Sequence, residues 1–387
     1  MSKPKKILLT AQYNKFGGAR YYFIHLLKFY NSQGYKVTVC LTKEDQQIEI
    51  TSIIEELGFN IITIRKRLRG FKQIFEQPVI SFFSDISLII RAYIKVNPDL
   101  VVVSNITPDA FLGLAFFRTP YICIVHSYPL DNLSRKYIIR MLQGLRRILL
   151  NWIFAKPKKK IVSVSNFSKR EIIKLFGVPE QSVSIIYNFG KKPAEALPRT
   201  DSNEQNHLIL TYGHVRYYKN PFDWISVAEK VIQYFPNTSI QFIWGGDGEL
   251  LDSSKALVNS MGLEDKIKFI GFTRDVDLYY KSATIYFQPS LLESHGIAVV
   301  DAMAYSLPCV VSNVGGLPES VSNGENGYFV NVDDLNAMSE AIISIIIDED
   351  LRKQMGRNSL NIFNEKFSYD IWTAKMKVIH ERIFDYK

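Results

Sequence analysis

The sequence predicts an α/β protein of two domains, each built around a parallel sheet. Short apolar runs alternate with segments of helical periodicity along most of the chain, which is the pattern of β/α units. At 387 residues the chain exceeds one ordinary core. A proline-rich and polar stretch, residues 191–206, is typical of an interdomain linker. We therefore expect domains at 1–190 and 207–366, and a final helix over 367–387.

The first half of the chain is expected to form an alternating β/α domain. Its first strand, Ile7–Thr10, precedes a glycine loop, and a helical pattern follows that ends at Gly34. The pair Gly17-Gly18 in this loop is compatible with a close approach of backbone to a ligand phosphate and equally with a tight turn. There is no GxGxxG fingerprint of a dinucleotide site. Further strands are predicted at Val37–Leu41, Ile61–Ile64, Leu100–Val103, Tyr121–Val125, Ile161–Ser165 and Val183–Ile186.

The second half contains the stretch around which we expect the chain to be organised, residues 286–321. An apolar run over Ala283–Phe287 ends at a proline turn, and a helical pattern then begins at His295-Gly296. Leu307-Pro308 stops that helix, and a second apolar run leads to the Gly315-Gly316 loop. Strand, loop, helix and strand in this order indicate a parallel sheet, whose ligands bind beyond the carboxyl ends of the strands. Other strands of this half are predicted at His207–Tyr212, Ile240–Trp244, Lys268–Gly271 and Cys309–Val311.

Two carboxylates flank the start of this helix. The backbone amides around His295–Ala298, together with the helix dipole, form a site suited to a phosphate. Glu293 precedes the helix, and Asp301 lies roughly 10 Å further along at about 1.5 Å per residue. In a sugar nucleotide, Glu293 would meet sugar hydroxyls and Asp301 a ribose diol. Taken alone, the two acids fit a loop acid and a solvated helix position equally well.

Two further features lie at predicted strand ends. Arg216 and Lys219 occupy the loop between the strand His207–Tyr212 and the next helix. A basic pair there fits a diphosphate clamp, and it fits ordinary surface charge equally well. His126 directly follows the strand Tyr121–Val125, which places it at the ligand edge of the sheet. A single histidine at such a place is more often a turn residue.

The stretch around Glu293 closely resembles the nucleotide-sugar site of the retaining GT-B glycosyltransferases of family four. That family has an acid, seven residues and a second acid, followed by a Gly-Gly loop and another acid. The sequence departs from the pattern twice: the second acid is Asp301 in place of Glu, and His295 stands where an aromatic residue is usual. The matching positions are Glu293, Gly296, Asp301-Ala302-Met303, Pro308, Gly315-Gly316 and Pro318-Glu319.

The resemblance implies the GT-B fold, with two Rossmann-like domains facing across a cleft and a last helix that returns to the first domain. It implies that Glu293 orients the donor sugar, that Asp301 binds the ribose and that His126 faces the sugar from the first domain. Lys219 matches the family's phosphate-binding lysine, and His214 stands at its arginine position, so either Arg216 or His214 supplies that contact. The remaining donor-binding positions that the resemblance implies are Gly17, Gly18, Phe272, His295, Gly296, Ile297 and Ala298.

The implied reaction is transfer of a sugar from a nucleotide-diphosphate sugar, a UDP-sugar rather than a GDP-sugar, with retention and without a metal. Two rivals stay open: a nucleotide-sugar 2-epimerase of the same fold, which needs no acceptor, and a non-catalytic partner subunit. The departures at His214 and Asp301 fit the second rival, whereas the joint presence of Glu293, Lys219 and His126 favours the enzyme. No oligomeric state is predicted.

Composition indicates a cytoplasmic globular protein. Hydrophobic residues make up 47% and charged residues 22% of the chain. Three cysteines, Cys40, Cys123 and Cys309, lie far apart without metal-ligand spacing, as is typical of reduced thiols. The first apolar run is too short for a signal peptide, and no stretch approaches the roughly 20 apolar residues of a membrane span.

Charge is divided unevenly between the two halves. Residues 1–190 contain 28 basic and 12 acidic side chains, whereas residues 191–387 contain 19 and 26. Residues 133–160 combine a basic character with an apolar stripe at helical spacing, and Arg65–Arg69 adds a second basic cluster. We expect the first half to dock on the inner face of the cell membrane and to meet a lipid-linked acceptor there. The alternative is a long surface helix that packs on its own domain and has a solvated basic face; no motif supports nucleic-acid binding. The stripe consists of Ile138, Leu142, Leu145, Leu149 and Trp152.

Overall fold

The computed structural model describes residues 4–11, 18–42, 48–64, 90–104, 117–126, 137–193 and 206–385, without the side chains of 137–143. The chain forms two compact units. Unit 1 comprises Met1–Ile186 and Thr373–Lys387, and unit 2 comprises Tyr187–Trp372. These limits differ by a few residues from the sequence-based boundaries at 190 and 367. Most of the predicted linker, 194–205, lies outside the described residues.

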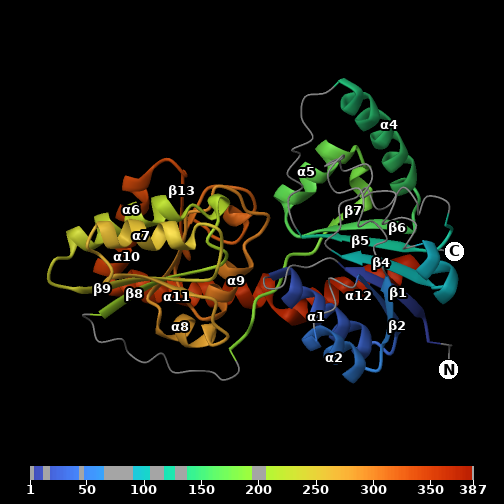
Figure 1. Ribbon diagram of the computed structural model, residues 1–387, viewed down its shortest axis with the longest axis horizontal. Helices are drawn as coiled ribbons and strands as arrows, with labels where there is room; N and C mark the ends of the chain where they lie inside the picture. Colours follow the sequence, from blue (N-terminus) through green and yellow to red (C-terminus); the bar gives the residue numbers. More distant parts are fainter. Residues whose placement is uncertain are drawn as a thin grey trace. The chain divides into compact units, whose positions relative to one another are not determined.

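Unit 1 contains a seven-stranded parallel sheet in the order β3-β2-β1-β4-β5-β6-β7 (Figure 1). β4 and β5 are buried along their whole length, as expected for a parallel sheet with helices on both faces. Each strand predicted for this half is present. The strands are β1 (Lys6–Ala11), β2 (Lys36–Thr42), β3 (Asn60–Ile64), β4 (Leu100–Ser104), β5 (Tyr121–Val125), β6 (Lys159–Ser163) and β7 (Val183–Ile185).

Helices α1 (Gly18–Ser32) and α2 (Ile48–Glu56) cover one face of this sheet, and α4 (Tyr137–Phe154) and α5 (Asn166–Phe176) cover the other (Figure 1). The last helix, α12 (Tyr369–Asp385), begins in unit 2 and joins unit 1 from Thr373 onward. Its buried His380 lies 3.1 Å from the hydroxyl of Tyr30 on α1. A short 3₁₀ turn, η2 (Glu180–Ser182), precedes β7.

Unit 2 contains a six-stranded parallel sheet in the order β10-β9-β8-β11-β12-β13. The predicted strands are again present, and β13, a strand of only four residues that follows a turn, was not predicted. The strands are β8 (Asn206–Tyr212), β9 (Ser239–Gly245), β10 (Ile267–Gly271), β11 (Ile285–Gln288), β12 (Cys309–Ser312) and β13 (Gly327–Val330).

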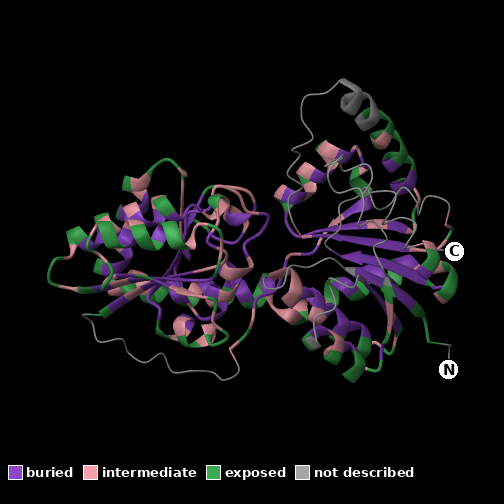
Figure 2. Cartoon of the chain, viewed as in Figure 1, coloured by how far each residue is buried: buried purple, intermediate pink, exposed green. Residues whose placement is uncertain are grey.

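The sheet of unit 2 is buried on both faces (Figure 2). Alternate residues of β8 enter opposite layers: Ile209 packs with Trp224 and Trp244, and Leu210 packs with Tyr286 and the apolar side of the helix α9 (Ile297–Ala304). The helices are α6 (Pro221–Tyr234), α7 (Leu251–Ser260), α8 (Val276–Ser282), α9 (Ile297–Ala304), α10 (Leu335–Ile347) and α11 (Glu349–Ile362), with the short turns η3 (Tyr217–Lys219), η4 (Leu317–Glu319) and η5 (Phe363–Phe367).

Candidate functional site

The carboxyl ends of β8, β11 and β12 bring most of the predicted site residues of unit 2 to one edge of its sheet. β8 leads into the loop that contains Lys219, β11 into the loop that contains Glu293, and β12 into the Gly315-Gly316 loop. The backbone amide of Leu291 donates to the carbonyl of Tyr218 at 2.8 Å and so ties the first two loops together. Ligands of open parallel sheets bind at this edge, and the geometry agrees with the prediction.

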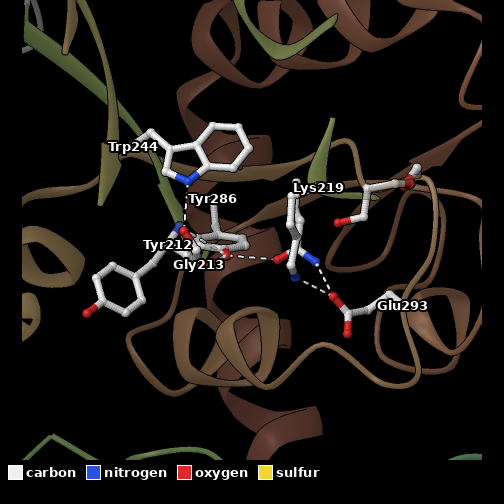
Figure 3. A network of polar contacts seen from close by, with 9 residues as sticks. Tyr212, Gly213, Lys219, Trp244, Tyr286 and Glu293 are labelled. Atoms are coloured by element: carbon white, nitrogen blue, oxygen red, sulfur yellow. Dashed lines mark hydrogen bonds and ion pairs between the residues drawn. The ribbon is translucent and has the colours of Figure 1, made fainter. Parts of the chain in front are cut away.

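Lys219 and Glu293 form a salt bridge at the centre of this edge (Figure 3). Their side chains are only 13% and 17% exposed, so each charge depends on the other for compensation. The amide of Gln288, the last residue of β11, donates to the same carboxylate oxygen at 3.2 Å. Gln288 in turn accepts a hydrogen bond from the hydroxyl of Tyr286 at 2.9 Å. Glu293 is therefore held by the end of β11 and by the loop that contains Lys219.

The loop that carries Lys219 is fixed at its beginning by β9. The indole of Trp244 donates to the carbonyl of Gly213 at 2.9 Å, and the amide of Gly213 donates to Gly245 at the same distance. Figure 3 shows Trp244, Gly213 and Lys219 in this arrangement. The beginning of the loop is thus fixed by hydrogen bonds to β9. Its last turn, η3, ends at Lys219, whose ammonium group pairs with Glu293.

The Gly315-Gly316 loop explains why Glu293 sits where it does. The amide of Gly316 donates to the carbonyl of Glu293 at 3.1 Å. Gly315 has a φ of +59°, and a Cβ built on it would overlap that same carbonyl oxygen. Any side chain here would push the two loops apart, so the glycine pair is a requirement of the backbone contact.

The start of α9 lies beside Glu293. Gly296 is the N-cap residue with a φ of 90°, and Ile297 and Ala298 are the first two helical residues. The amides at these positions have no partner within the helix, and the helix dipole adds partial positive charge. This local geometry is compatible with the phosphate site expected from the sequence, and phosphate binding here stays a prediction.

His295, the residue before the N-cap, is buried and does not provide a cation. Its ring stacks on Tyr187, with centroids 5.1 Å apart, and contacts Phe367 at 5.3 Å. Neither ring nitrogen has a hydrogen-bond partner within the described chain. Burial lowers the pKa of His295 to about 3, so the ring is neutral at neutral pH. The side chain packs as an aromatic residue would, and only its backbone remains available for the predicted role.

The carboxylate of Asp301, predicted to bind a ribose, is hydrogen-bonded to the protein backbone. It accepts a hydrogen bond from the backbone amide of Lys191 at 2.6 Å. The ammonium of Lys191 then pairs with Asp277 on α8 at 2.6 Å. Burial raises the pKa of Asp301 to about 7, and the amide of Lys191 partly opposes this shift. Ribose binding by Asp301 stays a prediction. In the structure this carboxylate binds the backbone at Lys191, the first residue of the predicted linker.

Arg216 is not brought to the Lys219–Glu293 pair. Its guanidinium lies 3.8 Å from Glu249, and both side chains are more than 40% exposed. The imidazole of His214 lies 3.2 Å from the carbonyl of Asp247. The carboxylate of Asp247 accepts from the amide of Phe272 at 3.1 Å. The phosphate contact predicted for Arg216 or His214 and the base contact predicted near Phe272 stay predictions.

The sites predicted in the first half belong to unit 1. The Nε2 atom of His126 lies 3.1 Å from the hydroxyl of Ser104, the last residue of β4. The ring of His126 also packs edge-on against Tyr22 of α1, 4.1 Å between centroids. Gly18 is the first residue of α1, whereas Gly17 lies outside the described residues. The contact of His126 with a donor sugar stays a prediction.

Gln288, Asp247 and Lys191 were not singled out from the sequence. Gln288 is a polar residue that ends a buried strand, which is a usable signal at the ligand edge of a sheet. Asp247 lies in a glycine-rich loop, and the contact of Lys191 with α9 is a tertiary one that no local pattern shows. Among the residues that the structure describes, no group of His, Cys, Asp and Glu could hold a metal ion.

Two family models match consecutive parts of the chain. The Glycosyltransferase Family 4 model matches residues 16–189, and the Glycosyl transferases group 1 model matches residues 194–361. The chain belongs to the group 1 glycosyltransferases. The Lys219–Glu293 pair and the start of α9 both lie within the part matched by the group 1 model.

Known proteins resemble this glycosyltransferase along most or all of its length. A UDP-Gal:α-D-GlcNAc-diphosphoundecaprenol α-1,3-galactosyltransferase of Escherichia coli is 24% identical over 336 residues, 82% of this chain and 84% of that protein. A glycosyltransferase structure from Rickettsia africae covers all of both chains with a TM-score of 0.78 at 18% identity. HepE of Anabaena in complex with UDP-glucose has a TM-score of 0.73 at 19% identity, over 98% of this chain and all of that one. The predicted GT-B fold class is thereby confirmed.

Proposed function

We propose that this glycosyltransferase transfers a sugar, with retention of its anomeric configuration, from a nucleotide-diphosphate sugar to a lipid-linked saccharide. In this reaction the bond between the anomeric carbon and the phosphate oxygen breaks. A hydroxyl of the acceptor bonds to the same face of that carbon, and its proton leaves with the products. The protein must hold the donor in position and stabilise the negative charge of the departing diphosphate.

The observation that carries the proposal is the Lys219–Glu293 pair beside the start of α9. The ammonium of Lys219 and the amides of Ile297 and Ala298 offer positive charge within one edge of the sheet. Such preorganised groups stabilise a leaving diphosphate without a metal ion. Glu293, held by Gln288 and by the Gly315-Gly316 loop, would accept hydrogen bonds from sugar hydroxyls.

The similar proteins support the finer choices of donor and acceptor. The E. coli relative is named for a UDP-sugar donor and a diphosphoundecaprenol-linked acceptor. HepE of Anabaena is in complex with UDP-glucose. We therefore propose a UDP-sugar as donor, a lipid-linked saccharide as acceptor and a place in polysaccharide assembly at the inner face of the membrane.

The first test is the effect of nucleoside diphosphates on thermal unfolding. A ligand that binds only the folded state stabilises it by about 2.7 kcal/mol at 100 times its Kd, or roughly 5–10 °C for a unit of this size. We expect UDP to raise the melting temperature of the wild type and of Lys230→Met, an exposed control on α6. If UDP, GDP and ADP all leave the melting temperature unchanged at millimolar concentration, the proposed donor site is wrong.

The second test separates transfer from epimerisation. We expect a UDP-sugar to be consumed only when a lipid-linked saccharide acceptor is present, with release of UDP and an anomeric product configuration equal to that of the donor. Conversion of the donor to its 2-epimer in the absence of any acceptor would contradict the transferase and support the epimerase. Binding of UDP without either reaction would support a partner subunit.

A further inference from the structure

Helix α4 presents an apolar row to solvent rather than to the core of unit 1. Ile148 is 68% exposed, Leu145 58% and Trp152 54%, and Leu149 is also exposed. Their spacing of three, four and seven residues places the four side chains on one face of the helix. We name these four residues, Leu145, Ile148, Leu149 and Trp152, the outer row.

The core of unit 1 uses a different face of the same helix. Leu150, Ile153 and Phe154 are at most 2% exposed and pack with residues of β4, β5 and α5. Figure 2 shows the described part of α4 with exposed residues along its length and buried ones near its end. The helix therefore packs on its own domain through Leu150, Ile153 and Phe154, and the outer row takes no part in that core.

The charged residues that surround the outer row in the sequence are all basic. Residues 144–160 contain six Lys and Arg and no Asp or Glu. Arg147 is exposed on α4, and the ammonium of Lys156 lies 3.7 Å from the ring centroid of Trp152. Lys158 follows four residues after the end of the helix. An aromatic residue with a lysine beside it is the arrangement of a membrane interface, where the ring is half immersed and the charge reaches the headgroups.

Two parts of the sequence-based prediction change. Lys159 does not belong to the basic surface, because it is buried and donates to the carbonyls of Phe117 and Thr119 at 3.1 and 2.8 Å. Burial also lowers the pKa of Lys159 to about 8. Residues 133–136, the side chains of 137–143 and the cluster Arg65–Arg69 lie outside the described residues, and the surface considered below consists of residues 144–160.

We infer that the outer row of α4 inserts into the headgroup region of an anionic membrane, with Arg147, Lys156 and Lys158 bound to its lipid phosphates. A lipid bilayer surface accounts for both parts of the pattern. The exposed apolar side chains fit the boundary with the acyl chains, and the cations fit the anionic headgroups. This surface lies in unit 1 and involves none of the residues proposed to bind the donor.

Tryptophan fluorescence provides a direct test because the outer row contains the one exposed tryptophan. Of the four tryptophans, Trp224, Trp244 and Trp372 are at most 1% exposed. On addition of phosphatidylglycerol vesicles at low salt, we expect a blue shift of the emission and quenching by brominated lipid. Trp152→Phe should abolish both signals and still co-sediment with the vesicles. Emission unchanged at saturating vesicles would overturn the inference.

Substitutions then separate the apolar and the charged contributions. Arg147→Gln, Lys156→Gln and Lys158→Gln together should weaken vesicle binding about 100-fold, at about fivefold for each cation. The matched control is Lys230→Gln, Lys255→Gln and Lys268→Gln, three exposed lysines of unit 2, and it should bind as the wild type does. Ile148→Ser with Trp152→Ser should weaken binding at least tenfold, whereas Ile347→Ser on α10, 60% exposed, should not.

Three results would count against the inference. Equal binding to phosphatidylcholine vesicles would show that anionic lipid is not required, and wild-type binding by the Ile148 and Trp152 variant would show that the outer row is not used. A dimer in sedimentation velocity that this variant abolishes would assign the outer row to a second copy of the chain. UDP should raise the melting temperature of every variant equally, so a failure of membrane docking is distinguishable from a failure of the proposed donor site.

Discussion

The Lys219–Glu293 salt bridge pairs the two groups that the proposed reaction needs: the ammonium for the diphosphate and the carboxylate for the sugar. The two side chains are mostly shielded from water, and removing one partner of such a pair leaves the other uncompensated. A donor that binds here must therefore draw the ammonium toward its diphosphate and leave the carboxylate for sugar hydroxyls. Lys219 and Glu293 are expected to part when the donor binds.

Substitutions at the pair should separate binding from transfer. Glu293→Gln keeps the size of the side chain and releases Lys219, so UDP affinity should be unchanged or higher, while sugar transfer falls at least 100-fold. Lys219→Met removes the ammonium and should weaken UDP binding at least tenfold. Isothermal titration with UDP and a transfer assay measure the two effects. An equal loss of UDP affinity in both variants would contradict the assignment.

His295 is a buried polar residue with an aromatic environment, and a phenylalanine should suit its position better. An unpaired buried nitrogen costs about 1–3 kcal/mol, so His295→Phe should raise the free energy of unfolding by about 1 kcal/mol at pH 7. His295→Ala is the control and should lower it by about 2–4 kcal/mol through the cavity it leaves.

The pH dependence of this effect has a definite sign. Because burial lowers the pKa of His295 to about 3, the unfolded chain binds a proton below about pH 6.5 that the folded chain does not. The wild type therefore loses stability as the pH falls from 6.5 toward 3, and His295→Phe should lose less. Urea unfolding at pH 7 and pH 5 measures the difference; an identical loss in both proteins would show that His295 is not buried as described.

At the scale of elements, the sequence predicted the position of the start of α9 beside Glu293 but not the contact of Asp301, on the same helix, with Lys191. The start of the helix follows from local signals: a buried strand, an acid, a glycine N-cap and the Gly315-Gly316 loop that must lie against it. The contact of Asp301 with the amide of Lys191 joins residues 110 positions apart, and nothing in the local sequence indicates it. The prediction of a ribose contact was made from spacing along the helix, which does not show what already occupies the carboxylate.

α4 and β6 show the same limit. Apolar residues lie on more than one side of α4, so spacing alone does not reveal that Leu150, Ile153 and Phe154 pack inward while Ile148 points to solvent. Lys159 stands in a run of three lysines and looks solvent-exposed in the sequence. Its burial is tolerated because the ammonium donates to the carbonyls of Phe117 and Thr119, some 40 residues away in the sequence.

Asp301 gives the element-scale prediction. Burial raises its pKa to about 7, above the value of 3.8 for an unperturbed aspartate, so the folded chain binds more protons than the unfolded chain between about pH 4 and pH 7. Stability should therefore fall as the pH rises through this window. Asp301→Asn can still accept from Lys191 and cannot ionise, so its free energy of unfolding should fall less between pH 5 and pH 8. The same slope in both proteins, measured by urea unfolding, would contradict the raised pKa.

At the scale of the whole molecule, charge and proposed function are divided between the two units. Unit 1 carries the surplus of basic residues and the outer row of α4, whereas unit 2 carries the surplus of acidic residues and the Lys219–Glu293 site. The sequence predicted this division because net charge is additive and needs no knowledge of packing. The chain passes between the units twice: from unit 1 to unit 2 after Ile186, and back to unit 1 within α12, at Thr373.

Each unit has its own sheet and core, so we expect calorimetry of the full chain to show two unfolding transitions, of which UDP shifts one. Ile342→Val in the core of unit 2 and Ile122→Val in β5 of unit 1 identify the transitions, since each substitution of a fully buried isoleucine should cost about 0.5–1.5 kcal/mol. UDP should raise the transition that Ile342→Val lowers, because the Lys219–Glu293 site and the start of α9 both belong to unit 2. If UDP instead raises the transition that Ile122→Val lowers, the donor site lies in unit 1. The same scan of Lys219→Met should show the unit 2 transition with a smaller UDP shift, which ties the calorimetric effect to the residue proposed to bind the diphosphate.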